Sequence, residues 1–224
     1  MNTMTKSIFE ICDSVAEQIF TQIHEACGSA PITTVKGKVT DHLFSAPSFR
    51  RAHISIVDAR DTHKLWLLHV TIFPDIRDGC PIYGFDIVAG PNKVSGAFHD
   101  FSSGGHTNNV LMRWFANRTK DITWNKKREL PEWAKSIFSD AMVAIGAVGP
   151  DELEQFCSLG LETLRYYLQN VGCTKSYLHD HSADQNFYCE QQRLNPHTPR
   201  VLQTLGFTEE EAINFVHQNL FPLI

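Results

Sequence analysis

Two titratable residues interrupt an apolar stretch in the first half of this chain. His69 and Asp86 lie within LLHVTIFPDIRDGCPIYGFDIVAG, which otherwise reads as two buried strands joined by a turn rich in Pro and Gly. A carboxyl group among apolar side chains favours its protonated form unless a cation or several hydrogen-bond donors stabilise its charge. A protonated acid beside a histidine is a proton source, so the pair predicts proton transfer.

The same pair also has a structural interpretation. Most buried polar groups are simply hydrogen-bonded, and a structural ion pair perturbs pKa values as a catalytic one does. Alternation along this strand puts four residues on the same face as His69, and they are Leu65, Leu67, Thr71 and Phe73. Apolar residues fill the opposite face as well, so we expect both faces of the sheet to be covered.

Composition limits the class of protein. The chain has 224 residues, 42% of them hydrophobic, which is enough for one substantial core. Since no linker rich in Pro, Gly or Ser divides it, residues 1–224 are expected to form a single domain. The net charge of −5 gives no general reason to expect nucleic acid or an anionic membrane as a partner. No stretch has the pattern of a signal peptide or the length of a membrane span, which predicts a cytoplasmic protein.

Hydrophobic periodicity predicts the elements that position the pair. Ser7 and Glu10 form a capping box that begins an amphipathic helix, and Gly28 ends it. Short runs separated by turn residues then predict an antiparallel meander. These runs are ITTVKGKV, AHISIV, LWLLHVTIF, IYGFDIV and VSGAFHDF. With a further strand at AMVAIGAV and helices after Pro150, the chain predicts a three-layer α/β/α sandwich with a central antiparallel sheet.

The sequence contains no motif for a nucleotide, a flavin or a metal. GPNKVSG lacks both the GxGxxG and the GxxxxGK[ST] patterns. His179, Asp180, His181 and Asp184 lie close together in the sequence, but their spacing matches no specific ligand pattern, so we expect no metal site. The six cysteines include no Cys-x-x-Cys pair, which is typical of reduced core thiols.

A short basic run stands out in this acidic chain. Lys126, Lys127 and Arg128 are consecutive, and they form either a solvated face or a docking surface for an acidic protein. RELPEW follows, in which Leu130 and Trp133 favour burial around a rigid proline. This pattern indicates that Arg128 turns inward.

Several of these segments together resemble one enzyme family. The segments are LLHVTIFP, CPIYGFDIV, RELPEW with IFSD, NFYCEQQRLN and TPRVL. From about Ala52 to the C-terminus the chain resembles the ferredoxin-dependent bilin reductases, above all the members that form phycocyanobilin. The resemblance implies that biliverdin IXα lies between the sheet and the C-terminal helices. It also implies a monomer without flavin or metal, in which reduced ferredoxin supplies single electrons and the protein supplies protons.

The resemblance assigns roles to eight residues. Asp86 becomes the principal proton donor, His69 its partner, and His53 a second histidine linked to the first through water. Ser95 and Arg128 match positions that hold the propionate groups of the bilin. Three positions belong to the C-terminal part of the pocket, namely Asn195 near its centre, Val201 in its lining and His197, where the family often has a propionate-binding lysine.

One departure from the family pattern bears on the product. The phycocyanobilin-forming members have a glutamate two residues after the histidine that His53 matches, and it protonates the exovinyl group of the D ring; here Ser55 takes that position. We therefore predict formation of phycoerythrobilin through 15,16-dihydrobiliverdin. Two alternatives remain, which are phycocyanobilin formation with Asp58 replacing the glutamate and a bilin carrier that performs no reduction. For the ferredoxin dock we predict the surface near Lys126 and Lys127.

Overall fold

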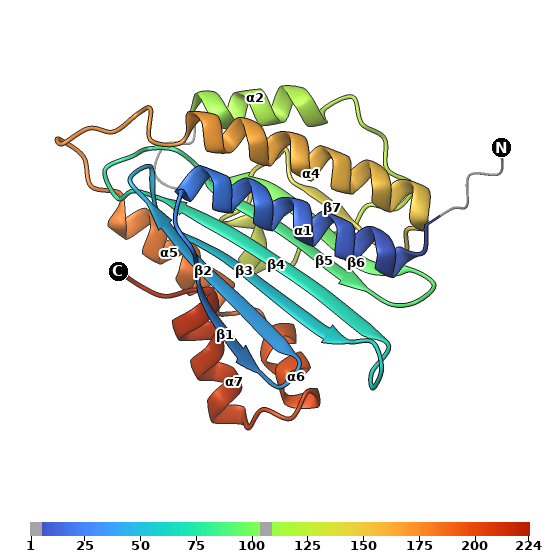
Figure 1. Ribbon diagram of the computed structural model, residues 1–224. Helices are drawn as coiled ribbons and strands as arrows, with labels where there is room; N and C mark the ends of the chain where they lie inside the picture. Colours follow the sequence, from blue (N-terminus) through green and yellow to red (C-terminus); the bar gives the residue numbers. More distant parts are fainter. Residues whose placement is uncertain (1–5, 104–108) are drawn as a thin grey trace.

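Seven antiparallel strands form one sheet in the part of the chain that the structure describes, residues 6–103 and 109–224 (Figure 1). In this computed structural model the strands follow one another in space in the order of the sequence. Their bounds are β1 (Ile32–Lys36), β2 (Val39–Ala46), β3 (Phe49–Ala59), β4 (Leu65–Pro74), β5 (Ile82–Ala89), β6 (Val94–Ser102) and β7 (Val143–Ile145). The predicted antiparallel sheet is thereby confirmed.

The first predicted strand is wrong in one respect. ITTVKGKV forms one strand and the start of another, because the chain reverses between Lys36 and Val39, which face each other in the β1–β2 register. Gly37 in this turn has φ +59°, a left-handed conformation that glycine adopts without steric cost. The second strand continues to Ala46, beyond the predicted run.

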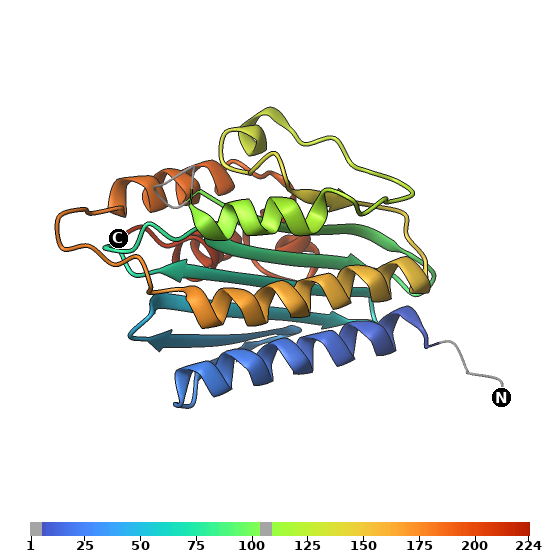
Figure 2. The ribbon, with the colours of Figure 1, turned by 90° about the horizontal axis from the view of Figure 1, so that it is seen from above.

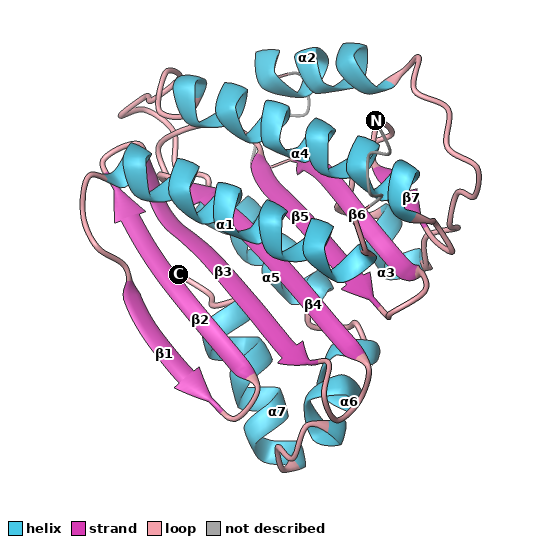
Figure 3. Cartoon of the chain, turned by 45° about the vertical axis from the view of Figure 1, so that its right-hand side comes forward, coloured by secondary structure: helices cyan, strands magenta, loops and turns pink. Residues whose placement is uncertain are grey.

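Helices cover both faces of the sheet, which confirms the three layers (Figure 3). Their bounds are α1 (Ile8–Cys27), α2 (Val110–Thr119), α3 (Glu132–Lys135), α4 (Pro150–Asn170), α5 (Ser182–Gln192), α6 (His197–Thr204), α7 (Glu209–Phe215) and the π-helical turn η1 (Val216–Leu220). The predicted capping box at Ser7 begins α1, and Gly28 ends it in a left-handed conformation. No helix in the described ranges is both long and apolar enough to span a bilayer.

The upper layer consists of α1, α4 and α2, which lie side by side on one face of the sheet (Figures 1 and 2). Its core contains most of the large buried side chains, including Trp66, Phe85, Phe101, Phe156 and Tyr167. Helix α4 approaches the sheet so closely that a Cβ atom on Gly160 would lie 2.2 Å from the Phe85 ring. This face of the sheet is therefore a close-packed apolar interior.

The lower layer consists of α5, α6, α7 and η1 and packs on the opposite face around a smaller apolar cluster. The strands present polar residues to this layer in two adjacent rows. One row runs across the sheet as His53, Thr71, Gly84 and Asp100, and the next as Ser55, His69, Asp86 and Phe98. The lower face of the sheet therefore carries titratable side chains next to an apolar cluster, which makes it the better candidate for an active site.

Candidate active site

His69 on β4 and Asp86 on β5 stand directly opposite each other in the strand register. Imidazole Nδ1 and carboxylate Oδ1 are 2.5 Å apart. With Nδ1–H donating to Oδ1 of the Asp86 carboxyl, Nε2 is left to accept from the Thr71 hydroxyl at 2.7 Å. The Phe221 ring packs edge-on against the imidazole, with ring centroids 5.4 Å apart. These neighbours hold the imidazole in one orientation.

The pair is less buried than strand alternation predicts. The side chain of His69 is 19% exposed and that of Asp86 is 33% exposed. The expectation of complete cover on both faces is wrong here, because the lower helices bury His53 and Ser55 of β3 but leave parts of β4 and β5 accessible. The other partly exposed residues on this face of the two strands are Leu65, Leu67, Gly84 and Val88. A bound molecule can therefore reach the Asp86 carboxyl.

His53 lies on β3, opposite Thr71, and its ring centroid is 6.3 Å from that of His69. Its Nε2 is 3.1 Å from Oδ1 of Asp41 on β2, and both side chains are buried. Burial lowers the pKa of His53, while the hydrogen bond to Asp41 acts in the opposite direction. The structure thus brings His53, His69 and Asp86 together on one face, as the sequence predicts.

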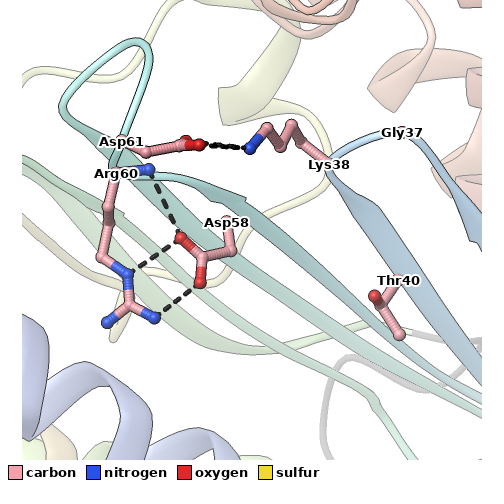
Figure 4. Close-up of a pocket in the computed structure, with 6 residues that line it drawn as sticks. All are labelled: Gly37, Lys38, Thr40, Asp58, Arg60 and Asp61. Carbon is pink, nitrogen blue, oxygen red and sulfur yellow. Dashed lines mark hydrogen bonds and ion pairs between the residues drawn. The ribbon is translucent and has the colours of Figure 1, made fainter.

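Ser55 stands beside the pair, directly opposite His69, and is buried. Asp58, in contrast, lies on the upper face of the sheet. Its carboxylate accepts hydrogen bonds from Arg60 Nε at 2.8 Å and Nη2 at 2.5 Å (Figure 4). Arg60 also binds Asp13 of α1. The Arg60 hydrogen bond lowers the pKa of Asp58. The carboxyl at position 58 therefore points away from His69 and is already paired.

A surface cavity of about 410 Å³ lies beside this Asp58 pair (Figure 4). Its lining consists of Gly37, Lys38, Thr40, Asp58, Arg60 and Asp61. Lys38 and Asp61 form an ion pair at 2.7 Å, so the charges in this cavity are matched within the protein. His69 and Asp86 do not belong to it.

Ser95 and Arg128 meet at the start of β6, the strand next to the one that carries Asp86. Ser95 lies at a register shift between β5 and β6, and its hydroxyl donates to the carbonyl oxygen of Val88. Arg128 Nη1 donates to the carbonyl oxygen of Ser95 at 3.0 Å, and its guanidinium lies 5.4 Å from the centre of the Phe98 ring. Phe98 stands opposite Asp86, so the Arg128 cation is one strand away from the acid. The side chain of Arg128 thus points toward the sheet, as predicted, but the residue as a whole is exposed and not buried.

The three C-terminal candidates lie on the lower side of the sheet. The hydrogen bonds of Asn195 described there are to its neighbours in the sequence. Asn195 Oδ1 accepts from the backbone N–H of His197 at 3.0 Å, and Asn195 Nδ2 lies 3.3 Å from the hydroxyl of Thr198. His197 is exposed at the start of α6, and Val201 is half-buried within that helix. The structure describes no contact between these three residues and the His69–Asp86 pair.

The basic run is exposed on the other side of β7. Lys126 and Lys127 precede Arg128, and Lys127 pairs with Ile145 of β7 in a single bridge. Lys127 and Arg128 also line a cavity of about 440 Å³ with Trp124 and Met142. The two lysines thus form a charged surface close to the propionate-binding candidates.

Sequence reasoning missed three residues of the lower face. Asp41 binds His53, and its signal is alternation with Val39 along β2. Asp100 is fully buried and accepts from Ser102 and from the backbone N–H of Ser139, and burial raises its pKa. Tyr188 of α5 packs against the sheet at Gly84, where its hydroxyl would lie 3.8 Å from a Cβ atom added to that glycine. Burial raises the pKa of this tyrosine.

The candidate metal ligands do not form a cluster. His181 and Asp184 are 3.5 Å apart across one turn of α5. Within residues 6–103 and 109–224, no group of three or more His, Cys, Asp or Glu side chains is close enough to hold a metal ion.

Comparisons with known sequences find two related enzymes of cyanobacteria. Phycocyanobilin:ferredoxin oxidoreductase from Synechococcus sp. strain CC9605 is 31% identical over 193 residues, which cover 82% of this chain and 75% of that enzyme. The enzyme of the same name from Prochlorococcus marinus strain MIT 9313 is 31% identical over 190 residues, which cover 82% and 70%.

Two solved structures have the same fold. The structure of a protein named PcyX superposes with a TM-score of 0.64 at 28% identity and covers 93% of this chain and 98% of that chain. Tomato phytochromobilin synthase in complex with biliverdin gives a TM-score of 0.62 over 95% of this chain and 82% of that chain. The second likeness, at 13% identity, shows the fold alone.

The sequence model of one family covers nearly the whole chain. It describes ferredoxin-dependent bilin reductases and matches residues 5–222, so the similarity extends beyond Ala52 to include α1. The chain therefore belongs to the ferredoxin-dependent bilin reductases and is an oxidoreductase.

Proposed function

We propose that this enzyme reduces biliverdin IXα to phycoerythrobilin through 15,16-dihydrobiliverdin. The observation that carries the proposal is the row of residues across the lower face, in which Ser55, His69 and Asp86 stand side by side. It combines an accessible acid–imidazole pair with a serine at the position where phycocyanobilin-forming members have a second carboxylic acid, a glutamate.

Asp86 is proposed as the principal proton donor and His69 as its partner. A conjugated tetrapyrrole delocalises an added electron, so the position of the acid decides which atom becomes protonated. The Asp86 carboxyl is the more exposed member of the pair, and His69 Nδ1 lies 2.5 Å behind it. Each proton that Asp86 gives to the bilin can then be replaced from the imidazole.

Ser55 determines which double bond is not reduced. A serine hydroxyl is too weak an acid to protonate an exovinyl group, and Asp58 is bound to Arg60 on the opposite face of the sheet. Reduction at the D-ring vinyl therefore lacks its proton source, and the enzyme would instead reduce the C15–C16 methine bridge and then the A-ring diene. This supports phycoerythrobilin as the proposed product.

Arg128 and Ser95 are proposed to hold the propionate groups. Within the described residues no carboxylate forms an ion pair with Arg128, whose guanidinium donates to a backbone carbonyl. A guanidinium in this state has N–H groups free for a planar carboxylate, the geometry in which arginine binds most strongly. We place Asn195, His197 and Val201 in the remainder of the pocket, on the side of the C-terminal helices.

Reduced ferredoxin is proposed as the electron donor, and no flavin or metal is required. The electrons arrive one at a time at the bilin itself, and the protein acts as a monomer that supplies protons. Lys126 and Lys127 are exposed near Arg128, so an acidic ferredoxin that docks there approaches the edge of the bilin site.

Anaerobic turnover with biliverdin IXα and reduced ferredoxin tests the proposal. We expect the absorbance of 15,16-dihydrobiliverdin to rise and then give way to that of phycoerythrobilin, with product identity checked by chromatography. Biliverdin that binds but is not consumed would contradict the proposal as a whole.

Phycocyanobilin formation is the second candidate, because the related cyanobacterial enzymes carry that name. The Ser55→Glu variant distinguishes the two products. A carboxyl at this position would lie opposite His69, and we expect it to divert part of the product to phycocyanobilin. Phycocyanobilin as the product of the native enzyme would contradict the role assigned to Ser55.

A further inference from the structure

The π-helical turn η1 ends in a way that leaves a backbone oxygen without a backbone donor. The N–H of Phe221 donates to the carbonyl oxygen of Val216 at 2.9 Å. The next bond of this pattern would join the N–H of residue 222 to the carbonyl oxygen of His217, but residue 222 is a proline and has no N–H. The last carbonyl groups of a helix need other donors, and here side chains supply them.

Two arginines are these donors. Arg193, which ends α5, donates from Nη2 to the carbonyl oxygen of His217 at 3.1 Å and from Nε to that of Phe221 at 3.0 Å. Arg51 of β3 donates from Nη2 to the carbonyl oxygen of Asn219 at 2.5 Å. Cations are favourable at the C-terminal end of a helix, so charge and hydrogen bonding act together. We call Arg51 and Arg193 the arginine clamp.

The arginine clamp is costly for a device that only closes a helix. Within the described residues neither guanidinium forms an ion pair with a carboxylate, and both residues are half-buried. Burial lowers the pKa of Arg51, which shows that its charge is partly removed from water. A partly buried cation without an anionic partner opposes folding, so its presence calls for a reason beyond the helix end.

Phe221, the residue that follows η1, gives that reason. It is 4% exposed, and its ring meets the His69 imidazole at an angle of 80° with centroids 5.4 Å apart. His69 Nδ1 in turn lies 2.5 Å from Oδ1 of Asp86. A hydrogen bond this short depends on the orientation of the imidazole. A shift of η1 would move the phenyl ring away and give the imidazole room to rotate.

We propose that Arg193, supported by Arg51, is a positioning residue that acts on His69 through Phe221. The structure describes no direct contact between Arg193 and His69, so an effect of one on the other passes through the C-terminal turn. This inference rests on the proposed function, in which His69 is the partner of the proton donor Asp86. It extends that function from the sheet to the end of α5.

A double-mutant cycle tests whether Arg193 acts through Phe221. Arg193→Met removes the guanidinium and keeps an unbranched side chain, and Phe221→Leu removes the ring and keeps an apolar one. In single turnover with reduced ferredoxin and biliverdin, we expect each variant to slow bilin protonation by about tenfold. The double variant should be no slower than Phe221→Leu alone, whereas two independent structural defects would multiply their effects.

Two further variants at arginine positions are the controls. Arg193→Lys keeps the positive charge at the helix end but lacks the planar fork that bridges two carbonyl oxygens, so we expect it to recover part of the rate. Arg165→Met removes the same charge from the exposed side of α4 in the upper layer, and it should react at the native rate.

Proton exchange at His69 supplies a readout that needs no substrate. By nitrogen-15 NMR, the Nδ1 proton of His69 should exchange with water about tenfold faster in Arg193→Met and in Phe221→Leu than in the native protein and Arg165→Met. Unchanged exchange in Arg193→Met, or a double variant in which the two rate losses multiply, would overturn the positioning role. Biliverdin left unconsumed by the native protein would contradict the proposed function, while the exchange rates test the positioning of His69 by themselves.

Discussion

The histidines on the two faces of the sheet differ in their burial and in their hydrogen-bond partners. On the upper face, His99 of β6 is fully buried; its Nδ1 donates to the carbonyl oxygen of Gly84 and its Nε2 bonds to Thr163, both at 2.7 Å. On the lower face, His69 is partly exposed and bonds to a carboxylate and a hydroxyl that can both exchange protons.

Burial lowers the pKa of His99 to about 4, so this ring stays neutral at physiological pH. A neutral imidazole with two fixed partners behaves as a core residue, whatever its intrinsic ability to transfer protons. The comparison shows that chemistry depends on the partners and on access to a substrate. It predicts that changes on the upper face alter stability and changes on the lower face alter catalysis.

The largest expected effect is on the upper face. Phe156 is fully buried, and its ring stacks on that of Phe85 with centroids 4.9 Å apart. Phe156→Ala should lower the free energy of unfolding by about 3–5 kcal/mol, from lost apolar contact and the cavity left behind. Denaturant titration measures this change. Folded Phe156→Ala should still bind biliverdin, and a stability equal to that of the native protein would break the comparison.

Asp86→Asn is the matching change on the lower face. The amide keeps the shape but cannot donate the acid proton, so we expect the rate of bilin protonation to fall by about 100-fold or more. Because the side chain is 33% exposed, we expect the denaturant midpoint to stay close to the native value. Anaerobic spectra should show bound bilin halted at a one-electron-reduced radical. An unchanged product yield would refute the donor role of Asp86.

The third effect concerns pH. The pKa of His99 is lowered from 6.5 to about 4 on folding, so the unfolded chain binds the proton more readily. The stability that comes from this group is fully present above pH 6.5 and is lost as the pH falls toward 4. Between pH 7 and pH 5 the free energy of unfolding should decrease by about 2 kcal/mol through His99.

Denaturant midpoints at the two pH values check this prediction. His99→Gln should be less stable at pH 7 but should lose much of the pH dependence. The control is His63→Gln, in an exposed turn, which should keep the native slope. If the free energy of unfolding of His99→Gln changed with pH as much as that of the native protein, burial of His99 would not be the cause of the pH dependence.

Much of this contrast between faces can be predicted from the sequence. Alternation over β4 separates the residues of the upper core from those beside His69, and the structure keeps that separation. Two polar residues in an apolar stretch identify His69 and Asp86, because a buried polar group needs a partner. Ser55 and His53 were located through the resemblance to the family.

The rest depends on register, which local patterns do not encode. Asp41 was missed because ITTVKGKV reads as one strand, although Gly37 turns the chain and begins β2 in a new register. The bond from Arg128 to Ser95 joins residues that are 33 positions apart, through a backbone oxygen that no side-chain pattern reveals. Partial exposure of the pair likewise depends on where the C-terminal helices pack.

The smallest expected effect lies outside both faces, at the basic run. Lys127→Glu should slow electron delivery from ferredoxin by about threefold to tenfold at low ionic strength, because surface charges act mainly on the rate of encounter. Lys6→Glu, which makes the same change of charge before α1, is the control and should have little effect. The difference should disappear near 1 M salt, where the screening length falls to about 3 Å. If the two variants responded equally at every ionic strength, net charge would be sufficient to explain the effect, and the docking surface would have to lie elsewhere.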